Sequence, residues 1–240
     1  MAYQSVFQRK EFKYILTRRQ AAMMKELISG KMRIDQYGPT TIRNIYFDTD
    51  DYKVIRESLE KPVYKEKLRV RSYSYAKAED KVFIELKKKY NGWGYKRRIQ
   101  AGNAISMEWL CEGGESPEDS QIAREITYFR DRLPGLSPKV FLTYEREAYE
   151  MTDGSAFRVT FDTNILGRET DMCFSSGIYG TPILSPELVI MELKIDGAIP
   201  LWMARGLDDH FIVRSSFSKY GEYYMNFIRS GNNEDQAFPA

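Results

Sequence analysis

Histidine and cysteine are scarce in this 240-residue chain, which contains one His and two Cys. A Ser-His-Asp triad would have His210 as its only base, and a metal site built from several histidines is excluded. Cys111 and Cys173 are too few for a structural zinc site or a disulfide framework. The chemistry must therefore rest on Lys, Arg, Asp and Glu side chains, with or without a metal ion.

Long hydrophobic runs are also absent. The longest stretch without a charged residue, 172–186, is too short to span a bilayer and contains Gly, Ser and Pro. The first residues, MAYQSVFQRKEFKY, lack the apolar segment of a signal peptide. We therefore expect a cytoplasmic protein without a transmembrane segment in this chain.

Charge of one sign is not in excess, because 36 Lys and Arg residues accompany 34 Asp and Glu residues. Affinity for a polyanion would therefore have to arise from how the charges are arranged. The lack of net basic charge argues against a broad external surface for nucleic acid. Aromatic residues make up 14% of the chain, but the following occur in core-like patterns and are expected to be structural: Tyr46, Phe47, Phe157 and Phe161. We expect no nucleic-acid partner.

Strand patterns dominate the chain, separated by a few helical patterns. The predicted strands are 6–14, 41–47, 63–75, 81–90, 95–100, 139–150, 156–164 and 188–195. The predicted helices are 17–28, 51–58, 104–111, 117–132, 200–206 and 218–229. Asn-Gly-Trp-Gly at 91–94 indicates a hairpin turn. The short links predict an α+β, mainly β, fold: a closed antiparallel eight-stranded β-barrel with peripheral helices, as one domain over 1–230, followed by a frayed tail at 231–240.

Cationic side chains alternate with apolar ones along several predicted strands. Because residues two apart share a face of a strand, one face of 65–73 carries Lys65, Lys67, Arg69, Arg71 and Tyr73. Apolar residues take the opposite face of this segment, and similar alternation occurs on at least five strands. A solvated outer sheet face is also rich in Lys, Arg and Glu, so periodicity alone leaves that alternative open.

The close spacing of arginines on one face favours a different interpretation. Like charges two residues apart repel each other unless an anion lies between them. If helices cover the apolar face of the strands, the charged faces must line the interior of a barrel. Such an interior is costly to desolvate without a ligand, and a polyanion held with a divalent cation would match it.

Seven segments together resemble a known family. In chain order they are RKEFKY at 9–14, RNIYFDT at 43–49, KLRVR at 67–71, IELK at 84–87, YER at 144–146, MELK at 191–194 and FSKY at 217–220. They resemble the VTC domain, the polyphosphate polymerase branch of the CYTH or triphosphate tunnel metalloenzyme superfamily, in a bacterial-type, stand-alone form. The resemblance covers about residues 6 to 228. No single segment is specific to this family, but the seven segments in the same order are together a strong match.

The resemblance implies a set of site residues in a basic tunnel. The phosphate ligands that it implies for catalysis are Lys13, Arg69, Arg71, Lys87, Arg146 and Arg158. Further phosphate-binding candidates are Lys67, Tyr144, Lys194, Ser218 and Lys219, together with Lys96 or Arg97, between which the register does not decide. Glu192 corresponds to the carboxylate that binds Mn²⁺ or Mg²⁺, and Glu85 and Glu11 are weaker candidates for the same ion.

Two departures from the family pattern affect what is carried over. The hydrolases of the superfamily begin with Glu-x-Glu-x-Lys, whereas Arg9 takes the first Glu position here, which favours the polymerase branch over a triphosphatase. Eukaryotic relatives also carry a regulatory domain before this one and membrane spans after it. We therefore do not expect inositol-phosphate regulation or coupled membrane transport.

The expected activity is ATP-dependent extension of polyphosphate, in which the γ-phosphoryl group of ATP passes to a phosphate or polyphosphate acceptor. The implied ligands are ATP and inorganic polyphosphate, triphosphate or pyrophosphate. Phosphoryl transfer requires positioning and charge neutralisation, so the scarcity of histidine is no obstacle. Two alternatives stay open: hydrolysis of triphosphate or nucleoside triphosphates, and a polyphosphate-binding module without catalytic activity.

Overall fold

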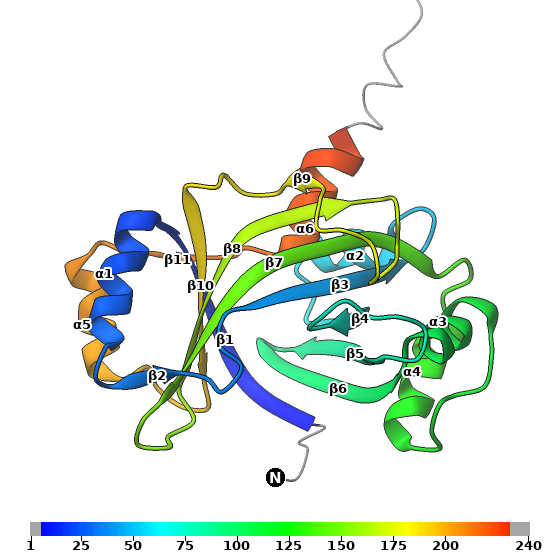
Figure 1. Cartoon of the computed structure of the whole chain (residues 1–240), viewed down its shortest axis with the longest axis horizontal. Coiled ribbons are helices and arrows are strands. Elements are labelled where there is room, and N and C mark those ends of the chain that lie inside the picture. Colours follow the sequence, from blue (N-terminus) through cyan, green and yellow to red (C-terminus); the bar gives the residue numbers. More distant parts are fainter. Residues whose placement is uncertain (1–5, 231–240) are drawn as a thin grey trace, which may run out of the picture.

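The computed structural model describes residues 6–230, whose strands form one antiparallel sheet with helices packed against it (Figure 1). The strands are β1 (Val6–Thr17), β2 (Met32–Ile34), β3 (Thr40–Asp48), β4 (Tyr64–Ser72), β5 (Lys81–Tyr90), β6 (Trp93–Gly102), β7 (Ser137–Met151), β8 (Arg158–Arg168), β9 (Thr181–Pro182), β10 (Leu188–Ile195) and β11 (Arg214–Ser215). The helices are α1 (Arg18–Ile28), α2 (Lys53–Leu59), α3 (Asn103–Glu112), α4 (Gln121–Asp131), α5 (Leu201–Asp209), α6 (Lys219–Tyr223) and the π-helix η1 (Tyr224–Ile228).

Local sequence signals determine where several elements begin and turn. Thr17 caps α1, because its hydroxyl accepts from the Gln20 amide at 3.2 Å while the Gln20 side chain accepts from the Thr17 amide at 3.0 Å. Asn91 and Gly92 have φ angles of 45° and 84°, as the tight hairpin between β5 and β6 requires. This two-residue turn fixes the register of the hairpin.

The strand order is β2-β7-β3-β4-β5-β6-β1-β10-β8-β9, β11 pairs with β1, and β7 also pairs with β8. The predicted α+β, mainly β, class is confirmed. The expected closed eight-stranded barrel is not what forms, because the sheet has eleven strands. The additional strands β2, β9 and β11 are two or three residues long. Segments this short cannot show the alternation from which strands are predicted.

Helices cover one face of the curved sheet, which we call the outer face. Helix α3 packs on β5 and β6, and helix α4 packs on β6, in a core that includes Trp109 and Phe129. Helices α1 and α5 pack on β1, β8 and β10 in a second core that includes Met24 and Met203. The apolar rows of the strands are buried in these clusters, and the predicted core residue Phe161 is one of their members. The opposite, inner face carries the charged rows and a further apolar cluster on β3 and β7.

Helices α6 and η1 pack against part of the inner face of β3 and β7. On β3, Ile45 and Phe47 belong to an outer core, whereas the Tyr46 ring stacks on Tyr220 of α6 at a centroid distance of 4.9 Å. Tyr144 of β7 belongs to the same cluster as these two tyrosines. The C-terminal helical segment therefore lies beside the charged rows of the inner face.

Several predicted boundaries need correction. Helix α4 begins at Gln121 instead of residue 117, because Ser120 caps it by accepting from the Ala123 amide at 3.1 Å. The predicted helix 218–229 is divided into α6 and η1. The predicted tail at 231–240 lies outside the described residues. None of the helices within residues 6–230 has the length and apolar character needed to cross a bilayer.

Candidate active site

A fully buried carboxylate on the inner face, that of Glu85 in β5, is surrounded by cations from both neighbouring strands. Arg69 donates to it through Nε at 2.9 Å and Nη2 at 2.7 Å. Arg71, Lys96 and Arg98 approach its oxygens at 3.9, 3.3 and 3.3 Å. Burial raises the pKa of the Glu85 carboxyl, but Arg71 and Arg69 outweigh this effect and hold the pKa well below its usual range. Positive charge remains in excess around this ionised group.

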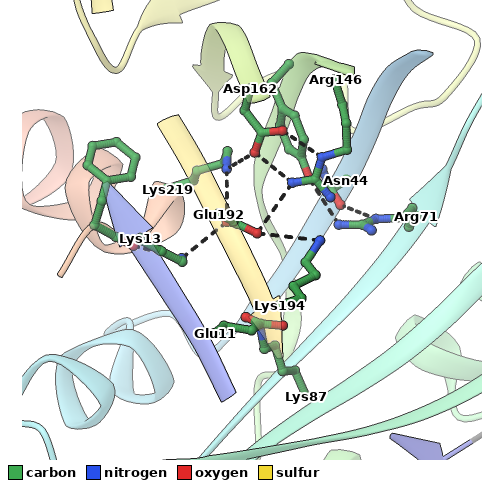
Figure 2. A network of polar contacts seen from close by, with 12 residues as sticks. Glu11, Lys13, Asn44, Arg71, Lys87, Arg146, Asp162, Glu192, Lys194 and Lys219 are labelled. Carbon is green, nitrogen blue, oxygen red and sulfur yellow. Dashed lines mark hydrogen bonds and ion pairs between the residues drawn. The ribbon is translucent and has the colours of Figure 1, made fainter. Parts of the chain in front are cut away.

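A second buried carboxylate, Asp162 of β8, forms the centre of another cluster (Figure 2). Arg146 of β7 binds it through two hydrogen bonds of 2.6 and 2.7 Å. Lys219 at the start of α6 donates to the same carboxylate at 2.6 Å. Two cations thus share one anion, and the planar guanidinium is held in the orientation that suits an oxyanion.

Glu192 of β10 lies next to this cluster, and cations approach it from several directions (Figure 2). Its oxygens lie 3.6 Å from Lys13, 3.7 Å from Lys219, 3.7 Å from Arg146 and 3.8 Å from Lys194. These separations exceed the length of a good hydrogen bond. Burial raises the pKa of the Glu192 carboxyl, but Lys13 and Lys219 keep it well below its usual range. Glu192 is therefore an ionised carboxylate that none of these four cations holds closely.

Glu11 of β1 accepts a hydrogen bond of 2.8 Å from Lys87 of β5 (Figure 2). Lys87 is the main reason that the pKa of Glu11 falls to about 2, against the opposing effects of burial and of Glu192. Glu11 pairs with Lys194 in the register of β1 and β10, and Glu192 precedes Lys194 by two residues on the same face, so the two carboxylates are diagonal neighbours (Figure 2). Glu11 is also ionised at neutral pH.

Two lysines on β4 contact neutral oxygens. Lys67 Nζ donates to the Ser218 hydroxyl at 3.2 Å, and Lys65 Nζ donates to the Ser58 carbonyl at 2.8 Å. Burial and the nearby Lys65 lower the pKa of Lys67 to about 7. Burial and Arg146 lower the pKa of Lys194 to about 7 as well. Cations on the inner face thus disfavour one another's charged forms, and the hydrogen-bond partners of Lys65 and Lys67 are uncharged oxygens.

The start of α6 is held against these clusters by buried contacts. Ser218 caps the helix by accepting from the Gly221 amide at 3.2 Å. Tyr220 donates to the buried Asp48 carboxylate at 2.8 Å, and Lys13 Nζ donates to the Phe217 carbonyl at 2.8 Å. These contacts hold Ser218 and Lys219 beside the charged clusters of the inner face.

The structure brings most of the predicted site residues together on the inner face. Tyr144 connects the two carboxylate clusters, because its hydroxyl accepts from Arg71 Nη2 at 3.1 Å while Lys219 lies 4.4 Å above its ring. Arg158 lies in the β8 row opposite Lys194 but pairs with Asp35 at 3.1 Å. The residues that converge are Glu11, Lys13, Lys67, Arg69, Arg71, Glu85, Lys87, Lys96, Tyr144, Arg146, Glu192, Lys194, Ser218 and Lys219.

The register of the hairpin decides between Lys96 and Arg97. Lys96 pairs with Lys87 and faces inward, whereas Arg97 pairs with the buried core residue Leu86 and faces outward. Arg97 donates to Glu125 of α4 at 3.1 Å. Arg97 is therefore not among the residues that converge on the inner face, because its side chain belongs to the outer face. The side chain of Arg9 lies outside the part of the chain that the structure describes.

Three inner-face residues were missed as candidates. Asp162 and Arg98 complete the carboxylate clusters, and Asn44 accepts from Arg71 Nε at 2.9 Å. The sequence contains a pattern that could have identified Asp162 and Arg98. Asp162 occupies the polar row of its strand, and a two-residue turn at Asn91 and Gly92 places Arg98 opposite Glu85. Nothing comparable identified Asn44, because strand alternation places it in one row with Ile42 and Tyr46.

The carboxylates of the inner face are the side chains that could bind a metal ion. Within residues 6–230, no three His, Cys, Asp or Glu side chains form a group that could hold a metal ion. Glu85 is enclosed by cations, so Glu85, Glu11 and Glu192 do not form one ligand set. Glu192 with its neighbour Glu11 fits a Mg²⁺-type ion that takes one or two carboxylates and completes its shell with phosphate oxygens and water.

Comparisons with known proteins agree with this arrangement. The family model for the VTC domain matches residues 8–227. The chain belongs to the VTC domain family. No curated protein matches this VTC domain in sequence.

Solved structures share the fold of this VTC domain at low sequence identity. A candidate adenylate cyclase from Bacillus halodurans is 14% identical, with a TM-score of 0.56 over 93% of this chain and 100% of that chain. A candidate adenylyl cyclase from Hippeastrum, described as having a dominant triphosphatase activity, is 16% identical, with a TM-score of 0.50 over 93% of this chain and 96% of that chain. At these identities, the likeness shows the fold alone.

Proposed function

We propose that this VTC domain is an ATP-dependent polyphosphate polymerase whose substrates bind along the inner face of the sheet. The observation that carries the proposal is the excess of cations on this face, where ten Lys and Arg side chains of the clusters accompany the four carboxylates of Glu11, Glu85, Asp162 and Glu192. Lys67 and Lys194 are held at a pKa of about 7 by burial and by neighbouring cations. A phosphate chain would relieve both this repulsion and the cost of burial.

The side chains of the inner face would divide the work of binding. Arg69, Arg71 and Arg146 present planar guanidinium groups, which match phosphate oxygens, while Lys13 and Lys219 supply compact charges. An oxygen of the acceptor's terminal phosphate would form a bond to the γ-phosphorus of ATP. The bond from the γ-phosphorus to its bridging oxygen would break, and ADP would leave. The protein holds the reactants in line and neutralises the developing charge.

A covalent phosphohistidine is not required for this reaction. His210 ends α5, whose core lies on the outer face, and its carbonyl accepts from the Gln20 side chain at 3.2 Å. Direct transfer between the two bound substrates therefore fits the placement of the side chains better than a phospho-enzyme does.

Glu192, with Glu11 beside it, would hold a divalent ion together with phosphate oxygens of the substrate. Bound Mn²⁺ or Mg²⁺ would neutralise charge on the transferring and leaving phosphates. The lysines near Glu192 would keep its carboxylate ionised and hence able to act as a ligand.

Hydrolysis is the second candidate function. The solved structure from Hippeastrum is described as having a dominant triphosphatase activity, and its fold is shared by this VTC domain. On the same inner face, water instead of a phosphate acceptor would then attack the terminal phosphorus. The choice depends on the nucleophile that the site admits.

One product assay distinguishes these functions. Purified protein is incubated with ATP and Mn²⁺, and the phosphate products are separated by gel electrophoresis. We expect chains that lengthen with time. Release of inorganic phosphate without longer chains would instead identify a hydrolase. Binding of polyphosphate without any turnover would identify a binding module and contradict the enzyme.

A further inference from the structure

The inner-face row of β4 changes its chemistry from one end to the other. It runs through Lys65, Lys67, Arg69 and Arg71 and ends at Tyr73, one residue beyond the strand. At about 3.3 Å per residue, the row is roughly 26 Å long, which exceeds the triphosphate group of a single nucleotide. A ligand lying along it would meet an aromatic ring at one end and lysines at the other.

The ring of Tyr73 is both accessible and attached to the phosphate-binding arginines. Tyr73 is 40% exposed. Its hydroxyl accepts from Arg98 Nη2 at 3.1 Å, and the Arg71 guanidinium lies 5.9 Å from its ring centroid. Phe83 meets the Tyr73 ring edge to face, with centroids 5.5 Å apart. The aromatic end of the row is thus continuous with the cluster around Glu85.

Three aromatic residues of β4, β5 and β6 near the lysine end of the row lie on the other face of the sheet. Tyr64, Tyr90 and Trp93 are paired with one another across β4, β5 and β6. By strand alternation, their side chains share a face with Leu68 and Leu86, which are buried in the outer core. One end of the β4 row on the inner face therefore carries the aromatic ring of Tyr73, whereas the other end carries lysines.

We propose that the exposed ring of Tyr73, supported by Phe83, stacks against the base of a nucleoside triphosphate. The inference rests on the proposed function, because it assumes that a nucleotide binds the inner face. The triphosphate then lies over Arg71 and Arg69, and the phosphate chain extends toward Lys67 and Lys65. An aromatic platform of this kind tolerates different bases, because every base offers a π face for stacking. GTP is therefore expected to bind about as well as ATP.

The experiment compares the binding of ATP with that of inorganic tripolyphosphate, which has the same phosphate groups but no base. Calorimetric titrations use the full chain and the variants Tyr73→Ala, Tyr73→Phe and Tyr90→Ala. Tyr73→Ala removes the ring, whereas Tyr73→Phe keeps the ring and removes the hydroxyl that accepts from Arg98. Tyr90→Ala is the matched control, because Tyr90 is 55% exposed but lies at the other end and on the other face.

We expect Tyr73→Ala to weaken ATP binding on the order of tenfold and to leave tripolyphosphate binding within about twofold. Tyr73→Phe should retain most of the ATP affinity, and Tyr90→Ala should change neither ligand. Equal losses for ATP and tripolyphosphate in Tyr73→Ala would mean that Tyr73 only supports the arginines, and no loss would mean that the base binds elsewhere. Either result overturns the inference and leaves the proposed function standing. Wild-type protein that binds neither ligand would overturn both.

Discussion

Lys67 and Lys87 lie directly opposite each other on β4 and β5, in the charged rows of the inner face. Lys87 donates to Glu11 at 2.8 Å, whereas Lys67 contacts the neutral hydroxyl of Ser218. Lys87 therefore has a countercharge within the protein, and its pKa is raised mainly by Glu11. Lys67 has a pKa of about 7, because burial and the lysines around it disfavour its charged form. Anion binding and proton binding are thus expected to be linked at this position.

The first prediction concerns proton uptake. A phosphate chain beside Lys67 and Lys194 favours their charged forms and raises pKa values that are about 7 without ligand. At pH 8, tripolyphosphate should therefore bind with uptake of protons, and its affinity should fall as the pH rises from 7 to 9. The fall should reach up to about tenfold per pH unit for each lysine. Titrations in buffers with different ionisation enthalpies measure the uptake.

The control for this linkage is Lys67→Met, which should take up fewer protons than the wild type at pH 8. Binding without proton uptake in the wild type would show that these lysines do not face the ligand.

The second prediction concerns the effect of the low Lys67 pKa on how protein stability depends on pH. The folded-state pKa of Lys67, about 7, lies below the value of 10.5 for an ordinary lysine. Between these pH values the unfolded chain binds more protons than the folded one, so the contribution of this group to stability rises with pH. Lys67→Met should therefore raise the midpoint of thermal unfolding more at pH 6 than at pH 10. An equal change at both pH values would contradict the low pKa.

The third prediction concerns the buried Glu85 carboxylate. Glu85→Gln removes the countercharge of Arg69, Arg71, Lys96 and Arg98 and leaves buried cations unbalanced. We expect the free energy of unfolding to fall by about 3–5 kcal/mol, as when one partner of a buried ion pair is removed. Tripolyphosphate should restore more stability to this variant than to the wild type. Chemical denaturation with and without the ligand measures both effects.

The matched control is Glu57→Gln, because the Glu57 side chain is 61% exposed and lies 3.9 Å from Lys53. Its effect should stay within about 0.5 kcal/mol. Equal stabilities for the two variants would show that the Glu85 cluster does not contribute as its burial indicates.

The fourth prediction concerns Glu192 as the metal ligand. Glu192→Gln keeps the shape of the side chain but removes the charge that would bind a divalent ion. We expect metal-dependent turnover of ATP to be lost while the circular dichroism spectrum remains that of the folded protein. Glu187→Gln is the control, because the Glu187 side chain is 80% exposed just before β10. Full activity of Glu192→Gln would remove Glu192 from the metal site.

Much of the inner face could be predicted from strand alternation, because one buried row per strand leaves a distinct pattern. The β10 boundaries 188–195 and the row from Lys65 to Arg71 were predicted in this way and are confirmed. The role of Asn44 could not be predicted, since it depends on Arg71, 27 positions away in the sequence. The division of the last helix into α6 and η1 also carried no local signal. Arg97 stayed a candidate because its orientation depends on the hairpin register, which the two-residue turn sets.

The most direct test of the central claim, that the inner face binds phosphate chains, is a calorimetric titration of tripolyphosphate into Arg69→Ala/Arg71→Ala. Both arginines lie on the inner face beside Glu85, with exposures of 15% and 8%. Loss of two charged hydrogen-bond donors predicts an affinity lower by on the order of a hundredfold. Arg33→Ala, at an exposed pair with Glu150, should bind like the wild type. An unchanged affinity in the folded double variant would contradict the account.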